Sequence, residues 1–425
     1  NIKRISFRDD INGLRAIAVS SVVFYHADLD LFKGGWLGVD VFFVISGYLI
    51  SNIIISELNE NKFSLREFYK RRAIRILPAL FSTMLFTVPL AYWLLTPKAL
   101  DEYLKSKISS TFFFSNFYFQ NLDFYIAEST KYMPFLHTWS LAIEEQFYIL
   151  FPIITIFLYK KINKKFFLIF FSFIFLGSIY LNLITQEIIK FYQLQFRVWE
   201  LLLGVIIMIL SFNIKINHLE KIGLPLLLIP IFYFDDSWIN DIEPKLTALI
   251  GISLIIFSNK EGTFVSSILN KKVFILIGLS SYSVYLLHQP IFAFSRIYFT
   301  QKAWKNLNDI YLSEGEIFIA LSLTFFLGYL NYFFIEKYFL NRKKLLYIFI
   351  LFTAVLSLDL FLKFNDSREV VYSNKLYEYT VNLENFTPTY DGRLCHDIEK
   401  LEDICSFNVE KKTKNYFARR FSCKR

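Results

Sequence analysis

The stretch GLRAIAVSSVVFYHA, residues 13–27, is apolar enough to form a membrane-spanning helix, yet it contains an arginine and a histidine. An ionisable side chain at the centre of a membrane helix costs about 2.5 to 3.5 kcal/mol on insertion scales, so such residues usually have a function. Arg15 and His26 are separated by about three helical turns plus 20°, and by a rise of about 16 Å. They therefore share one helix face, about half the hydrocarbon thickness apart, with a fixed cation at one end and a titratable imidazole at the other.

The rest of the chain has the same apolar character. Of its 425 residues, 55% are hydrophobic and 19% are aromatic, which is far more than one water-soluble core needs. A membrane helix requires about 20 mostly apolar residues. We therefore predict an all-α polytopic membrane protein with eleven spans, near residues 11–29, 36–57, 76–96, 139–159, 166–184, 194–211, 220–234, 244–258, 273–299, 315–335 and 345–362. Residues 108–126 are interrupted by polar side chains, and we predict an interfacial or re-entrant segment there.

Basic residues between these spans predict the orientation of the chain. The clusters KRRAIR (70–75), KKINKK (160–165) and NRKK (341–344) all fall on one side of the membrane if the N-terminus is inside. This is the positive-inside pattern, and it accounts for the net charge of +9 without a nucleic-acid partner. The N-terminus is thus expected inside and the C-terminal tail outside.

The chain divides into three predicted parts. Residues 1–340 hold about ten spans, residues 341–362 form the eleventh helix, and residues 363–425 form a polar extracytoplasmic tail. All three cysteines, Cys395, Cys405 and Cys423, lie in this tail. Cys395 and Cys405 are candidates for a short disulfide loop, and the alternative is that all three remain free thiols.

Several motifs in a fixed order extend the first stretch. The run GLRAIAVSSVVFYHADLDLFKGGWLGVDVFFVISG is followed by RRAIRILPAL (71–80), HTWSLAIEEQFYILFP (137–152), SYSVYLLHQPI (281–291) and FIEKYF (334–339). Together they resemble the signature of the acyltransferase-3 family of integral membrane O-acyltransferases, over roughly residues 7–340.

The resemblance implies a reaction and a location. Family members usually transfer acetyl from cytoplasmic acetyl-CoA to a hydroxyl of an extracytoplasmic glycan, such as a surface polysaccharide, a lipopolysaccharide O-antigen or the cell wall, at the bacterial inner membrane. On this basis His26 is the general base or carries the acyl group transiently, and Arg15 helps to hold the donor. Many members continue into an SGNH-type esterase-like domain. Residues 363–425 contain neither its GDS turn nor its DxxH dyad, which implies a separate SGNH-type partner or a truncated form.

Arg72 and Arg75 are three residues apart and share a helix face at the predicted inner mouth. Two guanidinium groups there suit the phosphates of coenzyme A, although a plain positive-inside cluster has the same spacing. Asp40 lies at a depth similar to that of His26. We therefore expect it to orient the imidazole, or else to face a water-filled vestibule.

Two further carboxylates are candidate site residues. Glu144 enters the membrane in HTWSLAIEEQFY and is expected to orient the acceptor hydroxyl or to pair with a buried cation. Glu336, at the inner end of the tenth span, is expected to pair with the basic cluster or to contact the donor. His288 is interpreted as a structural, hydrogen-bonded histidine. The five histidines show neither HxxxH nor HExxH spacing, so no metal is expected.

Two other classes of protein fit part of the pattern. A transporter of a glycan, lipid or organic acid could use Arg15 as an anion site and His26 as a proton relay, but no inverted repeat is evident. A non-catalytic membrane scaffold is favoured only by the short tail. The order of the motifs favours the enzyme.

Overall fold

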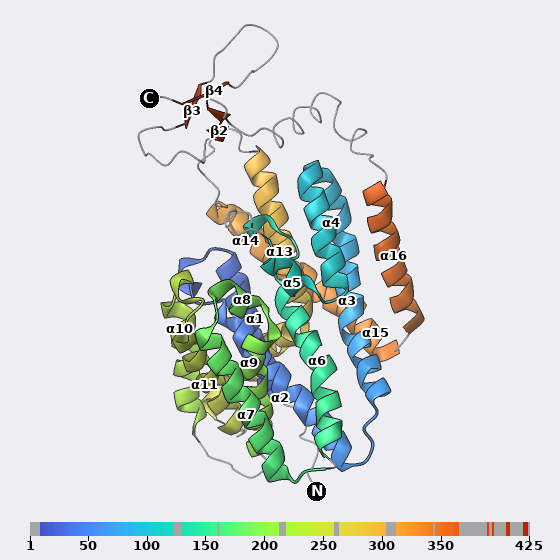
Figure 1. Cartoon of the computed structure of the whole chain (residues 1–425), viewed down its shortest axis with the longest axis vertical. Coiled ribbons are helices and arrows are strands. Elements are labelled where there is room, and N and C mark those ends of the chain that lie inside the picture. Colours follow the sequence, from blue (N-terminus) through green and yellow to red (C-terminus); the bar gives the residue numbers. More distant parts are fainter. Residues whose placement is uncertain are drawn as a thin grey trace. The chain divides into compact units, whose positions relative to one another are not determined.

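The computed structural model describes residues 9–122, 130–159, 161–211, 218–258, 263–302, 312–342 and 345–364, together with four short strands between residues 389 and 423. The chain forms two compact units, one of residues 1–95 and 99–364, and one of residues 96–98 and 365–425. The described part of the first unit is helical (Figure 1). Its α-helices are α1 (Asp9–His26), α2 (Leu37–Asn59), α3 (Leu65–Leu94), α4 (Pro97–Thr111), α5 (Ser115–Gln120), α6 (Thr138–Tyr159), α7 (Lys164–Ile184), α8 (Glu187–Tyr192), α9 (Leu194–Ser211), α10 (Glu220–Tyr233), α11 (Ile242–Ser258), α12 (Phe264–Leu269), α13 (Lys272–Lys302), α14 (Glu314–Asn331), α15 (Lys337–Arg342) and α16 (Leu345–Phe364).

Eight of the described helices are long and apolar enough to cross a membrane: α2, α3, α6, α7, α9, α13, α14 with its continuation to Leu340, and α16. This confirms the predicted all-α polytopic membrane protein. The other three predicted spans are helical but do not belong to this set. Helix α1 carries three charges, at Asp9, Asp10 and Arg15, and α10 and α11 have only 14 and 17 residues.

The segment predicted to be interfacial is a broken helix in the structure. Helix α4 ends at Thr111 and α5 begins at Ser115, with Phe113 between them at a φ of 58°. Residues 123–126 of the predicted segment lie outside the described residues.

The second unit contains two antiparallel strand pairs in its described residues. Strand β1 (Thr389–Tyr390) pairs with β2 (Arg393–Leu394), and β3 (Cys405–Asn408) pairs with β4 (Arg420–Cys423). The register of the second pair places Cys405 opposite Cys423. Cys395 lies outside the described residues, so its disulfide with Cys405 stays a prediction.

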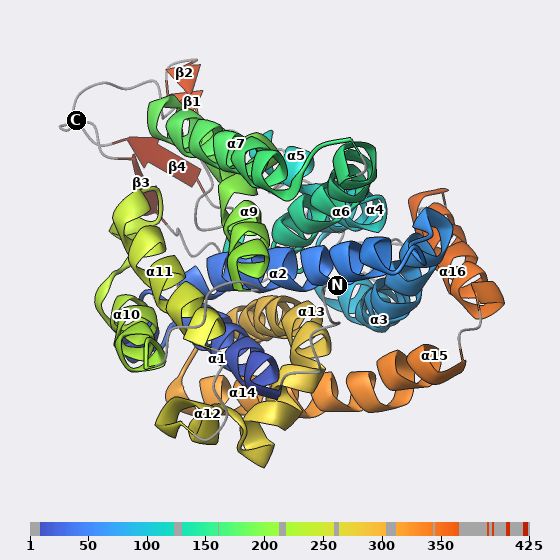
Figure 2. The same ribbon diagram turned by 90° about the horizontal axis from the view of Figure 1, so that it is seen from below.

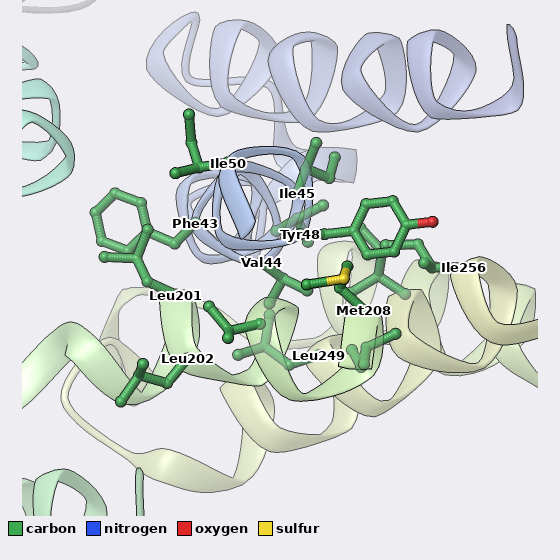
Figure 3. Packing of buried hydrophobic residues seen from close by; sticks show 14 of the residues in the cluster. Phe43, Val44, Ile45, Tyr48, Ile50, Leu201, Leu202, Met208, Leu249 and Ile256 are labelled. Atoms are coloured by element: carbon green, nitrogen blue, oxygen red, sulfur yellow. The ribbon is translucent and has the colours of Figure 1, made fainter. Parts of the chain in front are cut away.

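Helix α2 is the centre of the largest apolar core of the first unit. Its side chains interdigitate with those of α9 and α11 (Figure 3). The α2 and α9 backbones approach closely at two glycines, because a Cβ at Gly47 would collide with the Leu201 carbonyl and a Cβ at Gly204 with the Val44 carbonyl. Such glycines allow membrane helices to pack by direct backbone contact.

Helix α1 packs against both α2 and α13 (Figure 2). A Cβ at Gly278 of α13 would collide with the Asn12 carbonyl of α1, so these helices also approach closely. Leu14, Val22 and Val23 are fully buried in these contacts. The helix that carries Arg15 and His26 therefore lies inside the bundle, where its polar residues face other helices.

A buried ion pair joins α4 to α16. The Lys107 Nζ lies 2.6 Å from Asp359 Oδ1, and the two side chains are 0% and 2% exposed. Removing one partner of such a pair leaves an uncompensated charge and costs about 3 to 5 kcal/mol, whereas replacing both by apolar residues is often neutral. The eleventh predicted span is thus bound to the bundle through charge as well as apolar contact.

We expect the Lys107→Met variant to be less stable to heat in detergent than the wild type, because Asp359 stays buried without its cation. The double variant Lys107→Met with Asp359→Leu should recover most of the lost stability. Thermal unfolding followed by size-exclusion chromatography measures both. A double variant as unstable as the single one would contradict this interpretation.

Candidate active site

A cavity of about 550 Å³ lies among α1, α2, α3, α6 and α13, and we call it the arginine cavity. Helix α3 begins after Ser64, whose side chain accepts a hydrogen bond from the Glu67 backbone N–H. Its second and third turns carry the predicted guanidinium pair to the cavity wall. The polar lining residues include Asn12, Arg15, Ser46, Asn52, Arg72, Arg75, Ser140, Glu144, Tyr148, Tyr282 and Tyr285.

The three arginines of this cavity are not neutralised by contact ion pairs. Within the described residues, Arg15, Arg72 and Arg75 have no carboxylate oxygen within ion-pair distance. The neighbouring Arg71, by contrast, donates to Glu57 at 2.9 Å and does not line the cavity. Three arginines in the lining of one cavity suit an anionic ligand such as a phosphate, although Glu57, Glu60 and Glu144 also line it.

Glu144 belongs to the arginine cavity. Its carboxylate accepts a hydrogen bond from the Tyr148 hydroxyl at 2.8 Å, and the Tyr148 ring lies 5.1 Å from the Arg72 guanidinium. Glu144 and His26 line different cavities, so the expectation that Glu144 orients the acceptor hydroxyl stays a prediction. The other expectation, pairing with a buried cation, fits its electrostatic interaction with Arg72 and Arg15.

Glu336 lies behind the arginine cavity. It ends the π-helix η4 (Tyr332–Glu336), is 2% exposed and accepts a hydrogen bond from Ser283 at 3.1 Å. It interacts electrostatically with Arg15 and Arg75 but is not part of the cavity lining. Its position favours the predicted pairing with the basic cluster. Single-turn π-helices inside α-helices occur frequently at functional sites.

A second cavity, of about 480 Å³, lies at the other end of α1, and we call it the histidine cavity. Helix α1 ends at His26, whose side chain points to this space, while Arg15 lines only the first cavity. The polar lining residues include Tyr25, His26, Asp28, Asp40, Lys131, His137, Glu187, Arg197, Asp236, Asn240, Tyr285, Gln289 and Arg296.

The tautomer of His26 follows from its hydrogen bond. Its Nδ1 lies 2.9 Å from the Val22 carbonyl oxygen. A carbonyl can only accept, so Nδ1 carries the proton and the neutral ring presents an unprotonated Nε2. That nitrogen is the one a general base uses. The backbone of α1 thus prepares His26 for proton abstraction.

Three histidines meet beside this cavity. The His288 ring centroid lies 5.0 Å from that of His26 and 5.1 Å from that of His137. The His288 Nδ1 hydrogen-bonds the Tyr285 carbonyl at 2.5 Å, and its ring is fully buried. The prediction that His288 is structural and hydrogen-bonded agrees with this geometry. The cluster with His26 and His137 was not evident from the sequence, where the three lie far apart.

Asp40 does not orient His26. Its Oδ1 lies 2.6 Å from Nη2 of Arg197, a residue of α9, and Arg197 Nε lies 2.9 Å from Glu200. All three side chains are at most 2% exposed. Of the two expectations for Asp40, orientation of the imidazole does not fit this geometry, because depth in the membrane does not fix which neighbouring helix a residue faces. The other expectation, that Asp40 faces a vestibule, agrees with its place in the lining of the histidine cavity. The Val22 carbonyl takes over the orienting role.

Arg296, which sequence reasoning missed, fixes the end of α1. Its Nη2 donates to the His26 carbonyl at 2.5 Å and to Asp28 Oδ2 at 2.9 Å, and Lys131 Nζ contacts the other Asp28 oxygen at 2.8 Å. Asp28 has a φ of 56°, so the chain reverses immediately after His26. The sequence did contain a signal for these residues. Arg296 and Arg197 lie within predicted apolar spans, as Arg15 does, and an arginine in such a span is a candidate site residue.

The two cavities adjoin each other. Val39 and Tyr285 line both of them. A multi-pass helical bundle in which an anion-binding cavity adjoins a second cavity with a poised histidine has the features of a membrane-bound group-transfer protein.

Comparison with known proteins identifies the family. Residues 8–313 match the family described as the acyltransferase domain, and the chain belongs to this family. The resemblance seen in the sequence motifs is therefore confirmed.

Two relatives from Staphylococcus aureus show the extent of the similarity. A protein of strain MSSA476, named as a candidate O-acetyltransferase, is 32% identical over 366 residues, which cover 80% of this chain and 58% of the relative. O-acetyltransferase OatA of strain NCTC 8325 is 34% identical over 316 residues, which cover 68% of this chain and 51% of OatA. The chain thus spans little more than half the length of these relatives. No solved structure matches the chain.

Proposed function

We propose that this chain is a membrane-bound O-acyltransferase that moves an acetyl group from acetyl-CoA to a hydroxyl of a glycan on the opposite side of the membrane. The observation that carries the proposal is the pair of adjoining cavities at the two ends of α1, one lined by Arg15, Arg72 and Arg75 and the other by His26. Family membership and the name of OatA support acetyl as the group transferred.

The arginine cavity is the proposed donor site. Coenzyme A phosphates bind Arg72 and Arg75, and the pantetheine arm runs past Arg15 toward Tyr285. The cavity volume of about 550 Å³ falls within the range of ligand pockets, about 300 to 1,000 Å³. Because Arg72 and Arg75 belong to the basic cluster at residues 70–75, the positive-inside rule places this cavity on the cytoplasmic side. The proposed orientation has the N-terminus inside and the tail outside, and the resemblance to the family supports a bacterial inner membrane as the location.

The histidine cavity is the proposed acceptor site. Trp139 and Phe191, with ring centroids 4.5 Å apart, provide aromatic faces on which a sugar can stack. The oxygen of the acceptor hydroxyl attacks the thioester carbonyl carbon, and His26 Nε2 takes the proton of that hydroxyl. The carbon–sulfur bond then breaks, the thiolate of coenzyme A takes a proton from the imidazolium, and an ester remains on the glycan. Transient acylation of His26 leads to the same products. A separate SGNH-type partner stays part of the proposal as a further carrier of the acyl group.

The test uses membrane vesicles that contain the full chain, acetyl-CoA labelled in the acetyl group, and a panel of bacterial surface and wall glycans. Alkali-labile label on a glycan, absent from vesicles without the protein, is the expected result. Label that reaches no glycan, together with uptake of a glycan without acetyl-CoA, would favour a transporter instead.

We expect the double variant Arg72→Gln with Arg75→Gln to raise the KM for acetyl-CoA about 10²- to 10⁴-fold, because two contacts to phosphate are lost. Each charge-assisted hydrogen bond to a phosphate contributes about 1.5 to 3 kcal/mol, and 1.4 kcal/mol is tenfold. Arg66→Gln is the matched control, since Arg66 is on the same helix, is exposed and lines neither cavity. Its KM should stay within about twofold of the wild type. An unchanged KM in the double variant would remove these arginines from the donor site.

A further inference from the structure

Tyr285 of α13 occupies the boundary between the two cavities. It lines both of them, and Val39 is the other residue common to the two linings. Its ring centroid lies 5.2 Å from that of His137, on the side of the histidine cavity, and 6.3 Å from that of Phe42, which lines the arginine cavity. Tyr285 thus lies, together with Val39, at the boundary between the proposed donor site and the cavity of His26.

Two hydrogen bonds hold the Tyr285 side chain in place. Its hydroxyl donates to the His137 carbonyl oxygen at 2.8 Å and lies 2.6 Å from the Ser140 hydroxyl. His137 lines the histidine cavity and Ser140 lines the arginine cavity, so the hydroxyl joins the two walls. Neutral hydrogen bonds contribute only about 0.5 to 1.5 kcal/mol each. The side chain is thus fixed at rest but can be displaced by a ligand.

The separation of the two cavities affects which nucleophile His26 activates, the acceptor hydroxyl or water. A base poised for proton abstraction acts on water as readily as on a sugar hydroxyl, and water is far more abundant. Here the base lines one cavity and the arginines that would hold the thioester line the other. We propose that Tyr285 is a specificity-determining residue that keeps the donor thioester apart from His26 until the acceptor is bound, so that a glycan hydroxyl and not water receives the acyl group. This inference rests on the proposed function.

Removal of this boundary permits a defined side reaction. With an open connection, His26 Nε2 takes a proton from water as the water oxygen attacks the thioester carbonyl carbon. The carbon–sulfur bond breaks, and the thiolate of coenzyme A recovers the proton from the imidazolium. The products are acetic acid and coenzyme A, formed without any glycan.

The experiment compares Tyr285→Ala and Tyr285→Phe with the wild type and with Tyr180→Ala. Tyr180 lies on α7, is 63% exposed and lines neither cavity, so it is the matched control. Release of coenzyme A thiol is measured without acceptor, and ester formation is measured with the glycan that the wild type uses. General base catalysis contributes about 10²- to 10⁴-fold. We therefore expect Tyr285→Ala to raise acceptor-independent hydrolysis at least about tenfold and to lower the ratio of transfer to hydrolysis.

Tyr285→Phe keeps the ring and loses both hydrogen bonds of the hydroxyl. It should raise hydrolysis about two- to fivefold, in line with the loss of weak neutral hydrogen bonds. Because this change is conservative, it tests the inference even if Tyr285→Ala does not fold. Adding His26→Asn to Tyr285→Ala should remove the extra hydrolysis, since the side reaction uses the same base.

The possible failures are distinguishable. A wild type that acetylates its glycan, together with Tyr285 variants that keep the wild-type ratio of transfer to hydrolysis, would overturn the role of Tyr285 and leave the proposed function standing. A wild type that acetylates no glycan would overturn the proposed function, and the inference with it. Extra hydrolysis that persists after His26→Asn would also overturn the inference.

Discussion

Replacing His26 by asparagine lowers ester formation on the acceptor by about 10²- to 10⁴-fold, the contribution typical of general acid–base catalysis. An asparagine amide group can still donate to the Val22 carbonyl, which His26 Nδ1 approaches at 2.9 Å. The substitution thus preserves the local hydrogen bond and removes only the unprotonated Nε2. The rate of label transfer from acetyl-CoA to glycan is the measurement.

His218→Asn is the matched control for this variant. His218 is 61% exposed at the start of α10, has a φ of 69° and lines neither cavity. Asparagine tolerates that left-handed conformation, so the control should fold and transfer label at the wild-type rate. Equal transfer by His26→Asn and the wild type would remove His26 from the chemistry.

The same pair of proteins separates the two roles proposed for His26. If the histidine carries the acyl group, the wild type incubated without acceptor retains label in amounts comparable to the enzyme. His26→Asn should then retain none. If His26 acts only as a base, neither protein retains label. The proposed function accommodates both mechanisms, and this measurement chooses between them.

Replacing Arg197 by methionine destabilises the fold by about 3 to 5 kcal/mol, because two buried carboxylates lose the guanidinium that lies between them. Asp40 and Glu200 contact Arg197 at 2.6 and 2.9 Å. Lys245 also interacts electrostatically with both carboxylates, but the single cation that remains cannot balance two anions. Thermal unfolding of the purified protein in detergent measures the loss.

The control for this prediction neutralises one carboxylate as well. The double variant Arg197→Met, Glu200→Gln should be more stable than Arg197→Met alone, since one buried carboxylate, Asp40, then remains with one buried cation, Lys245. Arg197→Lys should be intermediate, because an ammonium group does not reproduce the fork that contacts two carboxylates. A single Arg197→Met variant as stable as the wild type would show that the pair is not needed for the fold.

The positions of the helices were predictable because hydropathy is a local property of the chain. Predicted spans such as 139–159 and 194–211 correspond closely to α6 (Thr138–Tyr159) and α9 (Leu194–Ser211). Helix α3 (Leu65–Leu94) begins well before the predicted start at residue 76. The reason is that its first turns are charged, and a hydropathy criterion excludes a polar helical extension.

The candidate site was predictable only within single helices. Helical spacing correctly placed Arg72 beside Arg75 on one cavity wall. It also placed Arg15 and His26 on a common face, but the structure divides that face between two cavities. Nothing in the local sequence indicated that Tyr285 separates them.

The sequence by itself determined that this protein is a helical membrane bundle of the acyltransferase family, with costly ionisable residues along its first helix. Only the tertiary structure decided that Asp40 faces Arg197, that Arg296 fixes the end of α1, and that Tyr285 lies between the two cavities. The physical reason is that the length of an apolar run and the helical period are properties of one segment, and they can be read without knowing its neighbours. The partner of a buried charge depends instead on which helices pack together and on how each is rotated about its own axis.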